Sequence, residues 1–151
     1  MKTVLSLIAF GALAHALLAD PSAEQWGEKV LGPTLSGAEF SEKERESLEK
    51  KYLVPELYRL LLRDRRESAK ANEPLRINFD WVSGAQEVPN SFRFLKASRS
   101  GEQTLLPAVL VFGNEKIRLT YVLIDGPTGF LIENIRYPED DLLTILQQDP
   151  P

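Results

Sequence analysis

Apolar residues recur at helical spacing in the first part of the chain. Residues 20–30 form a short amphipathic stretch around Trp26, which predicts a first helix. Gly32, Pro33 and Gly37 follow, and we expect them to break that helix.

Two longer helices are predicted next. Ser41 with Glu44 three residues later forms a capping box, so a second helix is expected to begin there. A third begins near Pro55, a residue suited to a first helical turn, and the helical half ends at Pro74. Its apolar positions form one core-facing stripe. The stripe consists of Leu57, Tyr58, Leu61 and Leu62.

The period changes to two in the second half, which predicts antiparallel strands. The predicted strands lie in segments 91–102, 104–116, 116–125 and 130–137, with Pro107 marking a bulge or an edge. One face is expected to carry Ile117, Leu119, Tyr121 and Leu123. A last short helix is predicted over 139–148. Helices followed by a meander predict an α+β fold, with N-terminal helices packed on a curved antiparallel sheet.

The N-terminus has the order of a secretory signal peptide: Lys2, an apolar run over 4–18, then small residues. We expect cleavage after Ala19, with cleavage after Ala16 as the alternative. A retained membrane anchor is disfavoured because the run is shorter than the ~20 residues that span a bilayer. The prediction is a signal peptide at 1–19 and one α+β domain at 20–151, located in the periplasm or secreted.

Composition excludes several kinds of chemistry. The chain has 151 residues, 43% of them hydrophobic and 26% charged, as in ordinary globular proteins. Its net charge of −4 argues against nucleic-acid binding. The only His is His15, the only Met is Met1, and Cys is absent, so the expected mature chain lacks imidazole, thiol and thioether groups. Cysteine nucleophiles, Ser–His–Asp triads, His-ligated metals and disulfides are therefore excluded. We expect no cofactor and no metal, and assign no catalytic residue.

The irregular segment 77–89 contains the first candidate site residues, Asp80, Trp81 and Gln86. A Trp beside an acid in a loop can line a ligand pocket. The alternative is a loop that packs against the sheet through Phe79 and Trp81, with Asp80 accepting hydrogen bonds from the backbone.

Glu133 is the second candidate, since it is the one acid among the apolar residues of the last strand. On a covered face its pKa would rise, and Tyr121 on the neighbouring strand would be a hydrogen-bond partner. On the outer face it would pair across strands with Arg118, and Phe130 and Ile132 would mark the covered face.

Arg59, Arg63 and Arg66 lie on one side of the third helix. They could clamp a carboxylate, a phosphate or an acidic partner. The alternative is a solvated helix face balanced by local pairs with the interleaved acids. Those acids are Glu56, Asp64 and Glu67.

Three segments together resemble a family of small exported bacterial proteins, the domain of unknown function 3828 family. They read YLVPELYRLLL, NFDWVSGAQE and YVLIDGPTGFLIENIRYP. The matching residues are Pro55, Glu56, Leu57, Phe79, Asp80, Ala85, Gln86, Glu87, Gly129, Phe130, Ile132, Glu133, Asn134, Ile135 and Tyr137. Phe130 stands where the family carries Trp, and Asn134 stands where it carries a second acid. The resemblance implies a cone-like fold similar to nuclear transport factor 2, in which a bent sheet wraps helices around a pocket.

The functional expectation is an exported soluble binding domain for an unknown protein or small molecule, such as a periplasmic inhibitor or immunity protein. Asp80, Trp81, Gln86, Tyr121 and Glu133 are the predicted ligand-binding residues. One alternative is a small isomerase-like enzyme that uses Asp80 or Glu133 as base and Tyr121 as oxyanion donor. The other is a structural module that forms a homodimer. We expect no contact with nucleic acid, and none with membranes after signal cleavage.

Overall fold

The computed structural model describes residues 22–150 and confirms the predicted α+β class. The helices are α1 (Ala23–Val30), α2 (Gly32–Leu35), α3 (Glu42–Tyr52), α4 (Pro55–Ala71) and α5 (Leu142–Gln147). The strands are β1 (Ser91–Phe94), β2 (Ser98–Ser100), β3 (Gln103–Phe112), β4 (Glu115–Gly126) and β5 (Gly129–Arg136). The predicted signal peptide lies outside the described residues. Within residues 22–150, no helix combines the length and apolarity that crossing a bilayer requires.

The helix starts follow the local sequence, with one short helix that the pattern did not predict. The capping box of Ser41 and Glu44 starts α3, and Pro55 occupies the first turn of α4, as predicted. The expected break after α1 is confirmed, since α1 ends at Val30; the short helix α2, which Gly32 and Pro33 open, was not predicted. A proline lacks the N–H that the first helical turn does not use, so it can begin a helix as readily as end one.

The sheet is open and antiparallel, in the order β1–β3–β4–β5, with β2 also paired to β3. The strand predicted over 91–102 is therefore interrupted: β1 and β2 both pair with β3, and residues 95–97 bulge between them. The irregularity lies opposite Pro107, whose carbonyl accepts the N–H of Leu95 at 2.8 Å. The N–H of Ala97 is donated instead to Glu24 of α1, at 2.9 Å.

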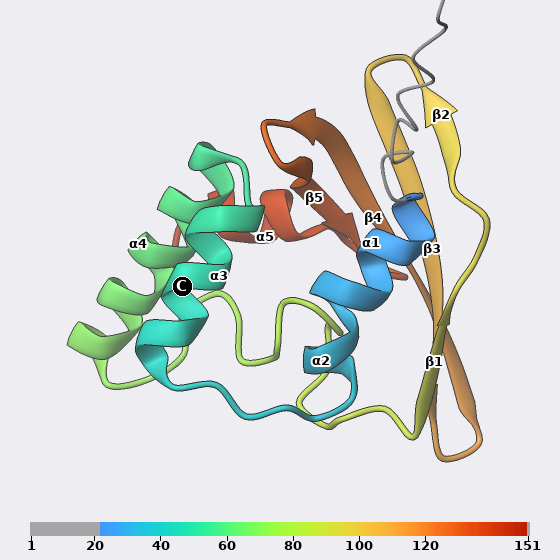
Figure 1. The fold of residues 1–151 in the computed structure, drawn as a ribbon. Helices are drawn as coiled ribbons and strands as arrows, with labels where there is room; N and C mark the ends of the chain where they lie inside the picture. Colours follow the sequence, from blue (N-terminus) through green and yellow to red (C-terminus); the bar gives the residue numbers. More distant parts are fainter. Residues whose placement is uncertain (1–21, 151) are drawn as a thin grey trace, which may run out of the picture.

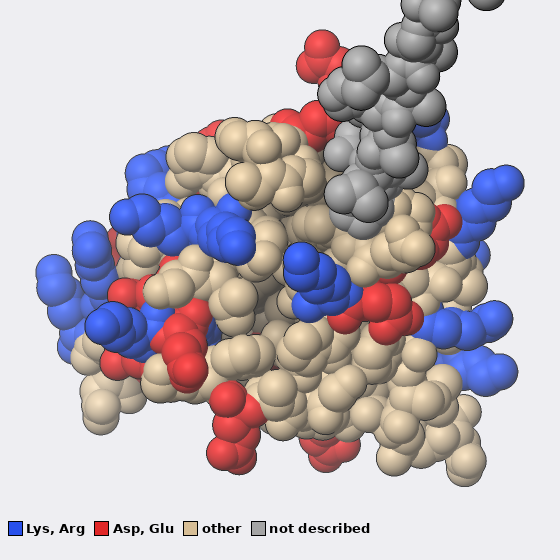
Figure 2. All heavy atoms as spheres, in the orientation of Figure 1, with Lys and Arg blue, Asp and Glu red and all other residues tan. Residues whose placement is uncertain are grey.

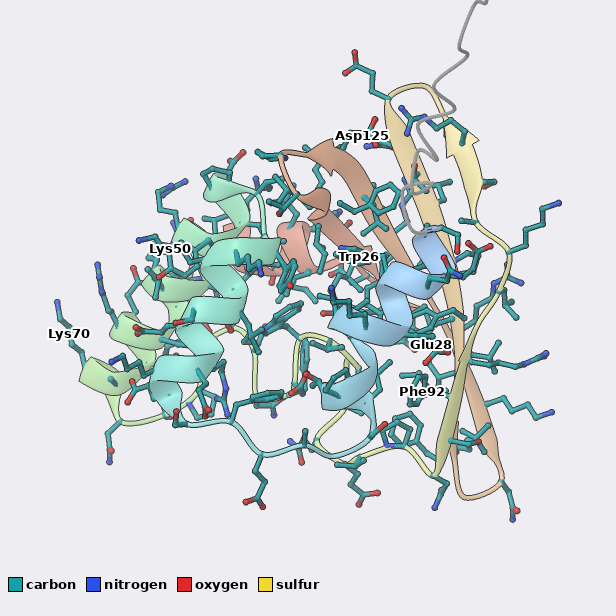
Figure 3. All side chains as sticks on the ribbon, in the orientation of Figure 1. Trp26, Glu28, Lys50, Lys70, Phe92 and Asp125 are labelled. Atoms are coloured by element: carbon teal, nitrogen blue, oxygen red, sulfur yellow. The ribbon has the colours of Figure 1, made fainter. Side chains whose placement is uncertain are left out.

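All the helices lie on one side of the sheet (Figure 1). The β4 residues Leu119, Tyr121 and Leu123 face them and are at most 1% exposed, which confirms that these residues share one face and shows that this face is covered. Trp26 of α1 lies between the helices and the sheet (Figure 3), with its ring edge-on to those of Tyr52 and Phe130. These contacts join α1, α3 and β5 into one core.

Strand β5 contains a bulge and a covered edge. Its register with β4 shifts between Val122 and Leu123, which leaves Glu133 as the extra residue. The backbone N–H of Val54, at the junction of α3 and α4, donates to the carbonyl of Ile132 at 3.0 Å. This bond covers part of an edge that would otherwise expose unpaired strand groups.

Candidate functional site

A cleft of about 1010 Å³ lies between the helices and the segment that leads to the sheet. Its walls come from α1 and α2, the link 37–40, α3, α4, and the segment 74–88. The hollow is visible in Figure 2, between the places that α3 and the α1–α2 segment occupy in Figure 1. The aromatic rings that line the cleft are Phe40, Tyr52, Phe79 and Trp81.

The floor of the cleft carries a tight turn formed by residues 80–85, which we name the 80–85 turn. The N–H of Asp80 donates to the carbonyl of Ala85 at 3.0 Å, and the N–H of Gly84 donates to the carbonyl of Asp80 at 2.8 Å. The Asp80 carboxylate also accepts the N–H of Val82 at 2.8 Å. The expected capping role of Asp80 is therefore confirmed, and it fixes the backbone that presents Trp81.

Two tyrosines hold the 80–85 turn from the sheet side. Tyr121 on β4 donates its hydroxyl to the carbonyl of Val82 at 2.6 Å, and Tyr137 donates to the carbonyl of Trp81 at 2.7 Å. Burial raises the pKa of both phenols well above its ordinary value, so both stay protonated donors at neutral pH. Gly84 lies directly against the Tyr137 ring: a Cβ there would come within 2.7 Å of that ring. The turn is thus fixed relative to the sheet.

A buried ion pair holds the cleft wall from the helix side. Glu49 of α3 has no exposed surface, and its carboxylate accepts two N–H groups from Arg65 of α4, one of them at 2.6 Å. The indole N–H of Trp81 donates to the same carboxylate at 2.9 Å. Hydrogen bonding to Glu49 keeps the pKa of Arg65 above its ordinary value. The three side chains tie α3, α4 and the 80–85 turn together.

Asp80 and Arg45 are the charged groups that face the open cleft near this network. Desolvation by the surrounding wall raises the pKa of Asp80, against lowering contributions from the N–H groups of Val82 and Ser83 and from nearby Arg45. Asp80 still contacts solvent, so water screens these interactions. No described carboxylate lies within ion-pair distance of Arg45, which is exposed on α3.

The structure brings three of the five predicted site residues together. Asp80, Trp81 and Gln86 all line the cleft. Tyr121 lies beneath it, fully buried, and does not line it. Glu133 lies elsewhere, on the side of β5 that faces away from the helices.

Two expectations about Glu133 are corrected by these positions. Tyr121 is not its hydrogen-bond partner, because the phenol is committed to the carbonyl of Val82. Arg118 is not its partner either: the Glu133 carboxylate accepts the side-chain amide of Gln103 at 3.1 Å. The register pairs Thr120 with Arg136, so Arg118 lies beyond the end of β5, whereas Glu133 lies near Gln103 at the start of β3.

Sequence reasoning missed Glu49 and Arg65. Glu49 lies in a helix rich in charged residues, and as a charged residue it reads as solvent-facing. Its burial depends on partners 16 and 32 residues away in the chain, which no local pattern reveals. The available signal was its position four residues before Leu53, on the side of α3 that turns inward.

No protein-family model, curated protein or solved structure matches this chain. The resemblance to the domain of unknown function 3828 family therefore stays a prediction. Within residues 22–150 there is no group of three or more His, Cys, Asp or Glu residues arranged to hold a metal ion.

Proposed function

We propose that this chain is an exported binding domain, and that its cleft takes a short segment of a partner protein. The segment carries an apolar side chain and a Lys or Arg. The observation that supports this most is the composition of the walls, which combine four aromatic rings and aliphatic residues with polar and charged side chains. Binding sites commonly join an apolar surface to oriented polar groups.

The size of the cleft favours a polypeptide segment over a metabolite. Its volume of about 1010 Å³ is at the upper limit of the roughly 300–1000 Å³ range of small-molecule pockets, and it is open along one side (Figure 2). Val88, 57% exposed, is the one large hydrophobic residue that the described chain leaves exposed, and it lies on the rim. An apolar side chain of a partner would bury it.

The charges of the cleft favour a basic segment. Glu49 is neutralised by Arg65, and Asp64 is paired with Arg76 at 3.2 Å. The charged groups that remain free to meet a ligand are Glu39, Asp80 and Arg45. Acids exceed bases among them, so a Lys or Arg of the partner gains more than an acid would. An inhibitor or immunity protein that covers a basic secreted enzyme or toxin fits this chemistry.

The bonding of the polar groups favours binding over turnover. The buried carboxylate of Glu49 accepts three N–H groups, and the phenols of Tyr121 and Tyr137 each donate to a backbone carbonyl. These groups hold the cleft in shape and have little capacity left to act on a substrate. Such bracing reduces the entropy lost on association, which strengthens binding.

One observation favours the second candidate, acid–base catalysis by Asp80. This carboxylate lies in the cleft with a raised pKa, as a general base at a partly desolvated site would. The oxyanion donor expected for it, Tyr121, is directed at Val82 instead. A turnover rate abolished by Asp80→Asn, with folding unchanged, would establish this alternative.

Two parts of the proposal, export and the family resemblance, come from the sequence. A free N-terminus at Asp20, measured by mass spectrometry on the protein recovered after secretion, is the expected result for the signal peptide. The one-sided helix layer and the bulged meander are the features that support a cone of the nuclear transport factor 2 kind. A purely structural role would leave the aromatic walls of the cleft without a purpose.

A peptide selection tests the binding proposal. Peptides chosen from a random display library on the purified protein are titrated while tryptophan fluorescence is followed, to which both Trp26 and Trp81 contribute. We expect enrichment of peptides with an aromatic or aliphatic residue near a Lys or Arg. Asp80→Asn and Val88→Ser should each weaken binding about three- to tenfold, as expected for one partly exposed contact.

The control for this titration is Glu115→Gln, which removes one exposed carboxylate at the start of β4, outside the cleft. It should leave the dissociation constant unchanged. Selected peptides that bind the Asp80 and Val88 variants as tightly as the natural chain would refute the proposed location.

A further inference from the structure

The outer side of α4 carries four basic residues in a row. Arg59, Arg63, Arg66 and Lys70 follow at intervals of four, three and four, so they occupy an arc of about 60° around the helix. We name them the α4 stripe. Together with Leu62 and Glu67 they line a depression of about 300 Å³, separate from the cleft. Lys70 projects away from the body of the molecule (Figure 3), and basic side chains crowd that side in Figure 2.

The acids expected to neutralise this stripe are engaged elsewhere. Asp64 and Glu67 both pair with Arg76, at 3.2 and 2.6 Å. The side chain of Arg76 is only 3% exposed, and its Nε donates to the carbonyl of Gln148 at 2.7 Å, so it is fixed in place. The expectation of a face balanced by local pairs is therefore wrong for two of its three acids. A buried arginine from beyond the helix pairs with both of them, although Glu67 still lines the depression.

Three of the stripe's basic residues, Arg59, Arg66 and Lys70, consequently keep their positive charge towards solvent. No described carboxylate lies within ion-pair distance of Arg59, Arg66 or Lys70. Arg63 donates through Nη2 to the carbonyl of Leu146 in α5, at 2.5 Å, which holds its guanidinium against the wall of the depression. Glu56, one turn from Arg59, is the third of the interleaved acids. A local positive field thus survives on a chain with a net charge of −4.

We propose that the α4 stripe is a binding site for a ligand with two or more phosphate groups. Phosphate suits it because each group carries up to two negative charges and accepts the forked donors of arginine. More than one is needed because the stripe extends about 16 Å along the helix, several times the width of one phosphate. The phosphates belong to one soluble polyphosphate ester or to neighbouring lipid headgroups.

The experiment uses the purified protein with two phosphate probes. Inorganic tripolyphosphate is titrated calorimetrically, and vesicles of phosphatidylglycerol are compared with vesicles of phosphatidylcholine by co-sedimentation. We expect saturable binding in at least one arm, weakened at least tenfold by Arg66→Glu combined with Lys70→Glu. Both substitutions lie on an exposed helix face, so folding should persist, and circular dichroism checks it. The arm that binds identifies the soluble or the lipid source.

The matched control reverses two basic residues on the sheet. Lys116→Glu combined with Arg118→Glu changes the net charge equally, at exposed positions of β4 outside the depression. Binding should be retained there. Equal losses in both double variants would show a general charge effect and overturn the site. A lack of binding in both arms would also overturn the site. Binding of hexaglutamate without binding of either phosphate probe would do the same.

Discussion

Removal of the Arg65 guanidinium should destabilise the fold more than removal of any other basic group on α4. Arg65 supplies two of the three N–H groups that the Glu49 carboxylate accepts, and Trp81 supplies the third. In Arg65→Met the carboxylate, which has no exposed surface in the natural chain, is left with one donor. Loss of one partner of a buried pair costs about 3–5 kcal/mol, because a charge remains without compensation.

The magnitude should fall at the lower end of that range. The side chain of Arg65 is 34% exposed, so water reaches the site once the guanidinium is gone. We therefore expect Arg65→Met to lower the free energy of unfolding by about 3 kcal/mol. For a domain of this size that corresponds to a drop in Tm of roughly 12 °C. Urea unfolding followed by tryptophan fluorescence measures the change directly.

Two further variants isolate the cause. Arg66→Met alters the neighbouring residue, which is exposed and has no described ion-pair partner, and should cost less than about 0.5 kcal/mol. Glu49→Gln keeps an acceptor for Trp81 without the charge, so adding it to Arg65→Met should recover about 2 kcal/mol. The reasoning fails if Arg65→Met is no worse than Arg66→Met, or if the double variant recovers nothing.

Three other predictions concern the 80–85 turn. Tyr121→Phe leaves the buried carbonyl of Val82 without its donor and should lower the free energy of unfolding in urea by about 1–3 kcal/mol. A smaller loss would show that this hydrogen bond does not hold the turn. Gly84 has a φ of +69°, and an added Cβ would lie 2.7 Å from the Tyr137 ring, so Gly84→Ala should lower the free energy of unfolding by at least about 2 kcal/mol. An unchanged free energy of unfolding would contradict this packing. The raised pKa of Asp80 means that ionisation opposes folding, so stability is lost as pH rises above its ordinary value of 3.8. As the pH rises above this value, the unfolding free energy of Asp80→Asn should therefore increase relative to that of the natural chain. A relative increase seen only below this pH would contradict the prediction.

Local sequence signals predicted much of the fold. The Ser41–Glu44 pair marked the start of α3 because a capping box is a contact between near neighbours. The alternation through Tyr121 identified which β4 residues share a face, because strand residues point to opposite faces in turn. The short helix α2 was not predicted, because a proline can begin a helix as well as end one.

The candidate site was only partly predictable because long-range pairs assemble it. Asp80 and Trp81 were identified from their own neighbourhood, a polar and aromatic loop between helix and strand. Glu49 was hidden because its burial follows from Arg65 and Trp81 rather than from its own helix. The β5 bulge similarly reoriented Glu133, since one extra residue changes which face every later side chain takes.

Mapping a bound peptide by amide chemical shifts tests the binding proposal most directly. The selected peptide is added to labelled protein, and the shift of each backbone amide is followed to saturation. The account predicts the largest changes at 37–52 and 77–88, the segments that form the walls of the cleft. Changes concentrated on the outward face of β3 and β4, with the cleft amides unmoved, would contradict it.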